Sequence, residues 1–197
     1  MYSTQNPIAI QSQKWLVSAL LVLMQKKAYK SITIKEIARK ADLDRSTFYR
    51  NFKSKQDILN FHLDSLTQDY ISKISELNEL DMQKIFKVFL DFCNVNLDFI
   101  ISLRRNGLSN LLLEAFNMRL PFIHELFQSK LPYKISEPNI ELVLAFNAGG
   151  MWNLLMRWID NGLIQNSADL TQVFKEASLL IQRERKRGYN EKPLLTI

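Results

Sequence analysis

Residues 42–52 read DLDRSTFYRNF and concentrate side chains that could bind an anionic surface. Hydrogen-bond donors are carried by Arg45, Ser46, Thr47, Tyr49 and Arg50, among others. A guanidinium group can donate two hydrogen bonds to O6 and N7 of guanine, and hydroxyl groups can bind phosphate oxygens or base edges. The segment also holds three apolar side chains, so it could equally be hydrophobic core with charges attached.

Helical spacing separates these two roles by direction. At about 100° per residue, Phe48 and Phe52 lie on one side of a helix and Arg50 lies almost opposite. Ser46 and Thr47 flank Arg50, and Tyr49 lies at the edge. The pattern predicts phenylalanines that point into a core and a polar row that points outward.

Two short predicted helices position this row, at residues 33–40 and 45–52. Thr33 and Glu36 form a T-x-x-E capping box at the start of the first. Asp44 is placed to accept hydrogen bonds from the first amides of the second. The three-residue connection, residues 41–43, gives the layout of a helix-turn-helix, whose second helix enters the major groove of DNA.

The positive charge of the chain is concentrated around this motif. Residues 1–60 carry 11 Lys and Arg against four acidic residues, a net charge of +7, whereas the other 137 residues carry 15 basic and 16 acidic groups, a net charge of −1. A compact basic module on a nearly neutral body is typical of a protein that binds phosphates with one end, although a charged, solvated surface alone would give the same totals.

The segment TIKEIARKADLDRSTFYRNFKSKQDIL, residues 33–59, resembles the DNA-binding signature of the TetR/AcrR repressor family. The matching positions are Thr33, Ile37, Ala38, Ala41, Thr47, Phe48, Tyr49, Phe52, Lys55 and Leu59. One position departs from the pattern, because Asp42 stands where the family has a turn glycine. If that residue needs a positive φ, we expect a small local strain.

The resemblance implies a role for each polar position. Thr33, Tyr49 and Lys55 would bind phosphates, which sets the register on DNA without reading sequence. Four residues would face the base edges: Arg45, Ser46, Thr47 and Arg50.

The rest of the chain predicts an all-α protein, since only five glycines and five prolines occur and apolar residues recur with helical spacing. The other predicted helices cover residues 11–26, 54–75, 82–105, 108–130 with a kink or split at Pro121, 138–161 and 168–187. We expect a helix-turn-helix domain at residues 1–56 and a helical effector-binding and dimerisation domain at residues 57–197.

In TetR-like proteins the last two long helices pair with those of a second copy. The stretch AFNAGGMWNLLMRWIDNG, residues 145–162, also resembles the C-terminal region of the subgroup that includes dihydroxyacetone-kinase regulators. The interface candidates are Gly149, Trp152, Trp158, Phe174 and Ile181. The alternative is that these residues form the core of one monomer.

Several polar residues lie in otherwise apolar helices and could face a ligand cavity. They are Cys93, Asn94, Asn96, His124 and Asn147. Each of them could also be an ordinary core or surface residue.

The sequence therefore predicts a TetR-like regulator that binds a palindromic operator as a homodimer and responds to a small-molecule effector. A co-regulator that acts only through protein contacts is the alternative. An enzyme that uses Cys93 with His62 or His124 is not expected, because no oxyanion motif accompanies them. Neither a metal nor a cofactor is predicted. The single cysteine and the lack of a signal peptide or membrane span predict a cytoplasmic protein.

Overall fold

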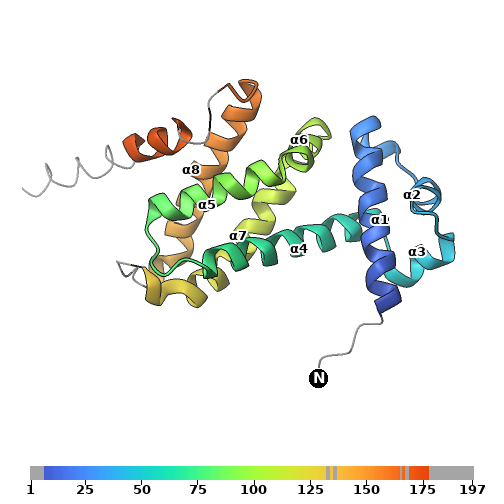
Figure 1. Cartoon of the computed structure of the whole chain (residues 1–197), viewed down its shortest axis with the longest axis horizontal. Coiled ribbons are helices and arrows are strands. Elements are labelled where there is room, and N and C mark those ends of the chain that lie inside the picture. The colour runs from blue at the N-terminus through green and yellow to red at the C-terminus, as the bar shows by residue number, and fades with distance from the viewer. Residues whose placement is uncertain (1–6, 132–133, 135–136, 165, 167–168, 178–197) are drawn as a thin grey trace, which may run out of the picture.

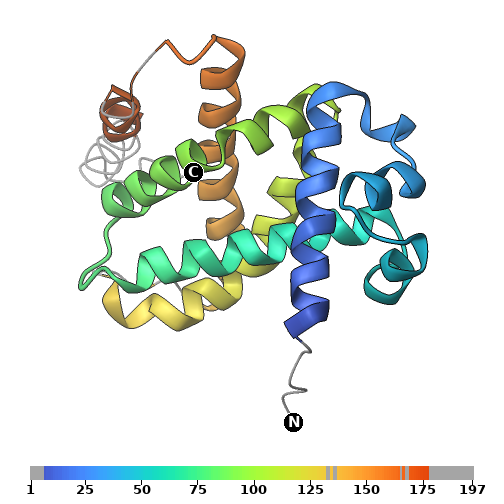
Figure 2. The ribbon, with the colours of Figure 1, turned by 45° about the vertical axis from the view of Figure 1, so that its right-hand side comes forward.

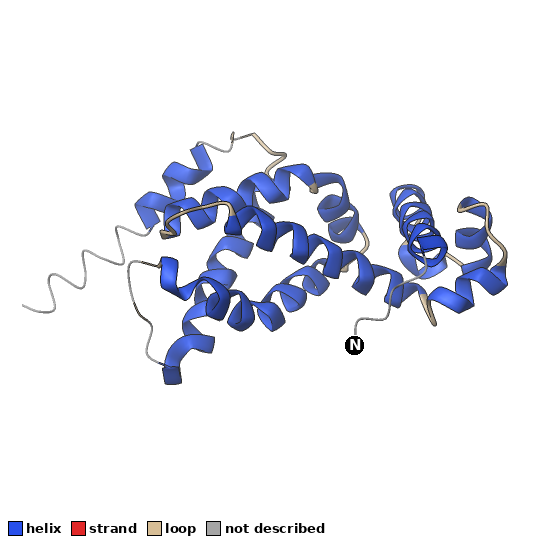
Figure 3. Ribbon diagram, turned by 60° about the horizontal axis from the view of Figure 1, so that its bottom comes forward, coloured by secondary structure: helices blue, strands red, loops and turns tan. Residues whose placement is uncertain are grey.

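A computed structural model describes residues 7–131, 134, 137–164, 166 and 169–177. Every regular element in these described ranges is a helix, and they contain no strand (Figure 3). The predicted all-α class is confirmed. The predicted interface residue Ile181 lies outside the described residues.

The N-terminal helices form a compact group at one end of the molecule (Figure 1). They are α1 (Pro7–Lys26), the short 3-10 turn η1 (Tyr29–Ser31), α2 (Ile34–Lys40) and α3 (Arg45–Asn51). α1 packs against α2, α3 and α4. It is long and apolar enough to cross a membrane, but its side chains Leu16 and Leu20 are fully buried among the other helices, as in the core helix of a globular domain.

Side-chain caps define where these helices begin. Thr33 and Glu36 form the predicted capping box at α2, and Ser54 forms a second one with Asp57 at α4. Asp44 is the residue before α3, but its carboxylate accepts no hydrogen bond from the first turn, so the predicted Asp44 cap is wrong. The backbone carbonyl of Asp44 accepts the first bonds of α3 instead, from the amides of Thr47 and Phe48.

The helix α4 (Lys55–Ser75) runs out of the N-terminal group and into the C-terminal bundle (Figure 1). Its first turns bury Ile58 and Leu59 in the core shared with α1. Its last turns bury Tyr70 and Ile74 against the bundle helices. One continuous helix thus contributes to both cores.

The bundle begins with two helices where the sequence predicts one. α5 (Met82–Val95) and α6 (Leu97–Arg105) are separated at Asn96, whose φ of −106° and ψ of 18° are not helical. The Asn96 side-chain amide donates a hydrogen bond to the carbonyl of Phe92 at 2.9 Å. Asparagine side chains compete in this way with the backbone bonds of a helix, which favours a break.

The bundle is completed by α7 (Ser109–Phe127) and α8 (Ile140–Asp160), which pack on each other. Figure 2 shows α8 standing beside α5 and α7. Pro121 lies inside α7 without splitting it, so the predicted split is wrong. Residues 169–177 are also helical, as expected for the start of the last predicted helix.

The turn of the helix-turn-helix contains a residue in the left-handed region. Asp42 has a φ of 55°, so the position does require the conformation that a glycine adopts without strain. Non-glycine residues other than Asn and Asp are uncommon there, and β-branched residues are true outliers.

We therefore expect Asp42→Val to lower the free energy of unfolding by about 1–2 kcal/mol, while Asp42→Gly leaves it unchanged or raises it slightly. Denaturant unfolding would measure both changes. Lys53→Val is the control, because Lys53 is an exposed residue without a positive φ. Equal losses for the two valine variants would contradict the assignment of strain to Asp42.

Candidate nucleic-acid interface and ligand cavity

The two faces of α3 have the predicted directions. Phe48 and Phe52 are buried, with 0% and 6% of their surfaces exposed. Arg45, Tyr49 and Arg50 are exposed to solvent. The phenylalanines therefore hold α3 onto the core, and the polar row is available to a partner.

The exposed side chains of α3 support one another. The Arg45 guanidinium donates to the Tyr49 hydroxyl at 3.1 Å and lies 5.4 Å from the centre of the Tyr49 ring. The Arg50 guanidinium donates to the Thr47 hydroxyl oxygen at 2.7 Å. These contacts hold both guanidinium groups on the outer face. Ser46 is exposed between them at the start of the helix.

Thr33 is part of a closed polar cluster at the start of α2. Its amide and hydroxyl donate to one oxygen of Glu36, at 2.9 and 2.8 Å, and the Lys27 ammonium donates to the other at 2.7 Å. The hydrogen bond from Lys27, followed by those from Thr33, lowers the pKa of Glu36 to about 2. The Glu36 carboxylate is therefore ionised and already neutralised by Lys27 near the surface assigned to DNA.

Lys55 is bound inside the chain rather than extended from it. Its ammonium donates to the carbonyls of Tyr29, Lys30 and Ile32 at 2.7, 3.2 and 2.8 Å, and it lies 4.5 Å from the centre of the Tyr29 ring. A lysine has three donors, and all three have these carbonyls as acceptors. Lys55 thus fixes the start of α4 to the segment that leads into α2.

We expect Lys55→Ala to lower the free energy of unfolding by about 1.5–3 kcal/mol, because hydrogen bonds from a charged group stabilise by about that amount. Thermal or denaturant unfolding would measure the loss. Lys53→Ala is the matched control, since Lys53 is exposed two residues away. If the two variants unfold alike, the three carbonyl contacts contribute nothing to the fold.

A second link joins the N-terminal group to the bundle at the end of α6. The backbone amide of Tyr29 donates to the side-chain oxygen of Asn106 at 2.6 Å. Two residues earlier, Arg104 forms a two-point contact with Asp160 at the end of α8, at 3.1 and 2.8 Å. The end of α6 therefore contacts both the helix-turn-helix region and α8.

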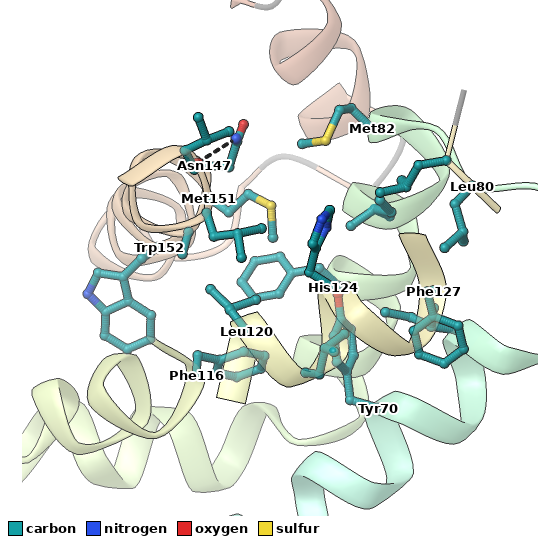
Figure 4. A pocket seen from close by; sticks show the side chains of 18 of the residues that line it. Tyr70, Leu80, Met82, Phe116, Leu120, His124, Phe127, Asn147, Met151 and Trp152 are labelled. Carbon is teal, nitrogen blue, oxygen red and sulfur yellow. Dashed lines mark hydrogen bonds between the residues drawn. The ribbon is translucent and has the colours of Figure 1, made fainter. Parts of the chain in front are cut away.

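A cavity of about 260 Å³ lies inside the bundle, lined by side chains of α4, α5, α7 and α8 (Figure 4). Most of the lining is aliphatic or aromatic. Three polar side chains reach it: Tyr70, His124 and Asn147. Burial raises the pKa of Tyr70 far above its usual range, so its hydroxyl group is neutral.

Two of the five predicted cavity residues lie in this cavity, namely His124 and Asn147. Cys93 is buried outside the lining, and burial raises the pKa of its thiol, which disfavours the thiolate that a nucleophile needs. Asn94 is exposed, and Asn96 occupies the break before α6, so these three residues do not line the cavity. Tyr70 was not predicted to line a cavity, because a tyrosine on the apolar face of a helix is normally interpreted as a core residue.

The predicted interface tryptophans lie inside the chain. Trp152 and Trp158 are 9% and 5% exposed, and Trp152 lines the cavity. In the single chain they leave almost no surface for a partner, as the monomer-core alternative expects, and their part in an interface stays a prediction. Phe174 stacks on Phe86 with ring centres 4.1 Å apart.

A different face of α8 is open to solvent. Leu142 and Phe146 are 72% and 69% exposed, and Gly150 and Asn153 continue the same face at helical spacing. A methyl group added at Gly149 or Gly150 would meet no atom within 4 Å. Within the described part of the chain, the two glycines therefore make room for no neighbouring residue.

Comparisons with known proteins agree with the geometry of the N-terminal group. The family described as bacterial regulatory proteins, tetR family, matches residues 16–60, which contain most of α1 and all of α2 and α3. An uncharacterised HTH-type transcriptional regulator, YvkB of Bacillus subtilis (strain 168), is 37% identical over 73 residues. That match covers 37% of this chain and 38% of the relative.

Solved structures resemble the whole fold. The dihydroxyacetone kinase operon activator DhaS has a TM-score of 0.57 and 21% identity, over 89% of this chain and 96% of that one. The fatty acid degradation regulator FadR from Bacillus halodurans has a TM-score of 0.56 and 16% identity, over 86% and 93%. These likenesses show a shared arrangement of helices.

The predicted family is thus supported by the motif, by the capped helix-turn-helix and by both kinds of comparison. The relatives named above are regulators rather than enzymes. Residues 16–60 match the family of bacterial regulatory proteins, tetR family, and they carry the helix-turn-helix described above.

Proposed function

We propose that the protein binds a palindromic DNA operator as a homodimer and that a small molecule in the bundle cavity changes its affinity for DNA. The observation that carries the proposal is the outer face of α3, where two guanidinium groups are held apart from a buried phenylalanine face. This is the chemistry by which a recognition helix reads the major groove.

Contacts on DNA divide into two kinds. Residues near the start of a recognition helix reach base edges, so Arg45 and Ser46 are proposed to read sequence, together with Thr47 and Arg50. Tyr49 and Thr33 are proposed to bind phosphates. Lys55 was also predicted to bind a phosphate. Its contacts with three carbonyls support an indirect role, in which Lys55 positions the start of α2 and α2 binds the phosphate.

A homodimer is proposed through the open face of α8. An exposed apolar row on a helix that otherwise packs into a core is typical of a surface that another chain covers. Gly149 and Gly150 leave room for close approach of a second helix, and Leu142 and Phe146 would supply the buried contact area. Two such subunits would present α3 twice, about 34–36 Å apart on one face of DNA.

Coupling between the cavity and DNA is proposed along two helices. α4 carries Tyr70 at the cavity and Lys55 at the helix-turn-helix. The end of α6 adds the contact from Asn106 to Tyr29. A coupling free energy of about 1–3 kcal/mol between effector and DNA would be enough to change occupancy of the operator.

The domain division at residues 1–56 and 57–197 and a cytoplasmic location are part of the same proposal. The names of the two structural relatives concern an operon activator and a regulator of fatty acid degradation. They support a role for this chain in regulating metabolic genes, either as an activator or as a repressor.

A mobility-shift titration with the DNA between this gene and its neighbours tests the proposal. We expect a discrete shifted band whose formation is prevented by excess specific DNA and not by unrelated DNA. A folded protein that binds no DNA in this titration would overturn operator binding and favour a co-regulator that acts through protein contacts.

A further inference from the structure

The cavity differs from an ordinary metabolite site in having no charged side chain. None of the described residues that line it is Asp, Glu, Lys or Arg. Among the polar lining groups, the hydroxyl of Tyr70 is held neutral by burial. A ligand that enters this space finds a few hydrogen-bond partners, and His124 is the one described lining side chain that can become a cation, when it is protonated.

A lysine beside the cavity wall is already bound elsewhere. The Lys130 ammonium lies 5.6 Å from the centre of the Phe127 ring, and that ring lines the cavity. The ammonium itself donates to the carbonyls of Ser75 and Leu77 at 3.0 and 2.8 Å, at the end of α4. Lys130 therefore neutralises the carboxyl end of α4 rather than the interior of the cavity.

The polar groups of the cavity are few and come from different helices. Tyr70 comes from α4, His124 from α7 and Asn147 from α8 (Figure 4). The Asn147 amide donates one hydrogen bond to the Val143 carbonyl at 2.8 Å, which fixes its orientation and leaves its side-chain oxygen as an acceptor. The remaining surface is built from aliphatic groups and aromatic rings.

From these contacts we infer that the effector is a small, uncharged and mainly apolar molecule with one or two hydroxyl or carbonyl groups. The inference rests on the proposed function and names the chemical class that its cavity takes. The volume of 260 Å³ lies just below the roughly 300–1,000 Å³ of sites for drug-sized ligands, so the molecule is small. Free fatty acids and other carboxylates are disfavoured, because a buried carboxylate would need a proton of its own or a proton on His124.

The matched pair octan-1-ol and octanoate tests this inference by calorimetry on the full-length protein at pH 7. An ordinary carboxyl group with a pKa near 4.3 is protonated in only about one molecule in 500 at this pH, so octan-1-ol is expected to bind at least about 100-fold more tightly. Equal or tighter binding of octanoate would overturn the inference. It would also be overturned if the protein bound neither octan-1-ol nor 2-naphthol, an aromatic alcohol of similar polarity.

Two variants place the binding at this cavity. Asn147→Leu is expected to lower the affinity for octan-1-ol by about 5- to 10-fold, the amount that one hydrogen bond contributes. Met151→Arg puts a cation into the lining and is expected to reverse the preference in favour of octanoate. An unchanged preference in a folded Met151→Arg protein would show that the alcohol binds elsewhere and would overturn the assignment.

The mobility shift separates this inference from the proposed function. If the protein shifts its operator but binds neither alcohol, the ligand class is wrong and operator binding stands. If it binds octan-1-ol in the cavity and shifts no DNA, the cavity chemistry stands and the regulatory role fails.

Discussion

Replacement of Arg45 by alanine is expected to weaken binding to the operator by about 2–6 kcal/mol, which is roughly 30-fold to 20,000-fold in affinity. The reason is that a bidentate arginine contact with a base discriminates by about 1–3 kcal/mol, and a dimer on two half-sites loses it twice. Arg45 is the first residue of α3, where recognition helices reach base edges, and Tyr49 holds its guanidinium group outward.

Lys87→Ala is the control for this change. It also removes one positive charge, but from the exposed surface of α5, where Lys87 pairs with Asp91 on the same helix. Titrations of the operator and of unrelated DNA at one salt concentration would measure both variants. If Arg45→Ala lowered the two affinities equally, Arg45 would be a phosphate contact and not a reader of sequence.

Replacement of Phe146 by glutamate is expected to convert the dimer into monomers. An anchor residue at the centre of an interface contributes about 2 kcal/mol or more, and in a two-fold symmetric dimer it counts twice, so the dissociation constant should rise by at least about 1,000-fold. Analytical ultracentrifugation over a range of concentrations would measure this. Because Phe146 is exposed in the single chain, the fold itself should not be affected.

Phe122→Glu is the matched control on another helix. Phe122 is also an exposed phenylalanine, on α7, where Met118 and Leu126 extend an apolar row at helical spacing. We expect this variant to remain dimeric. Monomers from Phe122→Glu and dimers from Phe146→Glu would move the interface from α8 to α7.

Local chemistry explains which features of the fold could be predicted from the sequence. The capping box at Thr33 depends on neighbouring residues alone, and it was expected. The break at Asn96 was missed because apolar residues continue on both sides of it. Pro121 was expected to kink or split its segment, and the helix continues through it.

Some features of the candidate site could also be predicted from local sequence, and others could not. The inward and outward faces of α3 follow from helical periodicity, so Phe48 and Arg50 could be assigned without coordinates. The cavity depends on how α4, α5, α7 and α8 meet, which no local pattern encodes. Likewise, Trp152 and Phe146 are both large aromatic residues of α8, and only the packing shows that one is buried and the other exposed.

The anchoring of Lys55 has a consequence for how binding responds to salt. The affinity of a protein for DNA falls with salt in proportion to the number of counterions that its cations displace from phosphates. Lys55 is bound to three carbonyls and Lys27 to Glu36, so neither ammonium group is free to displace counterions from phosphates. The slope of log affinity against log salt concentration should therefore be shallower than the 11 basic residues of positions 1–60 suggest. Such a regulator would retain much of its affinity for DNA when the ionic strength of its surroundings rises.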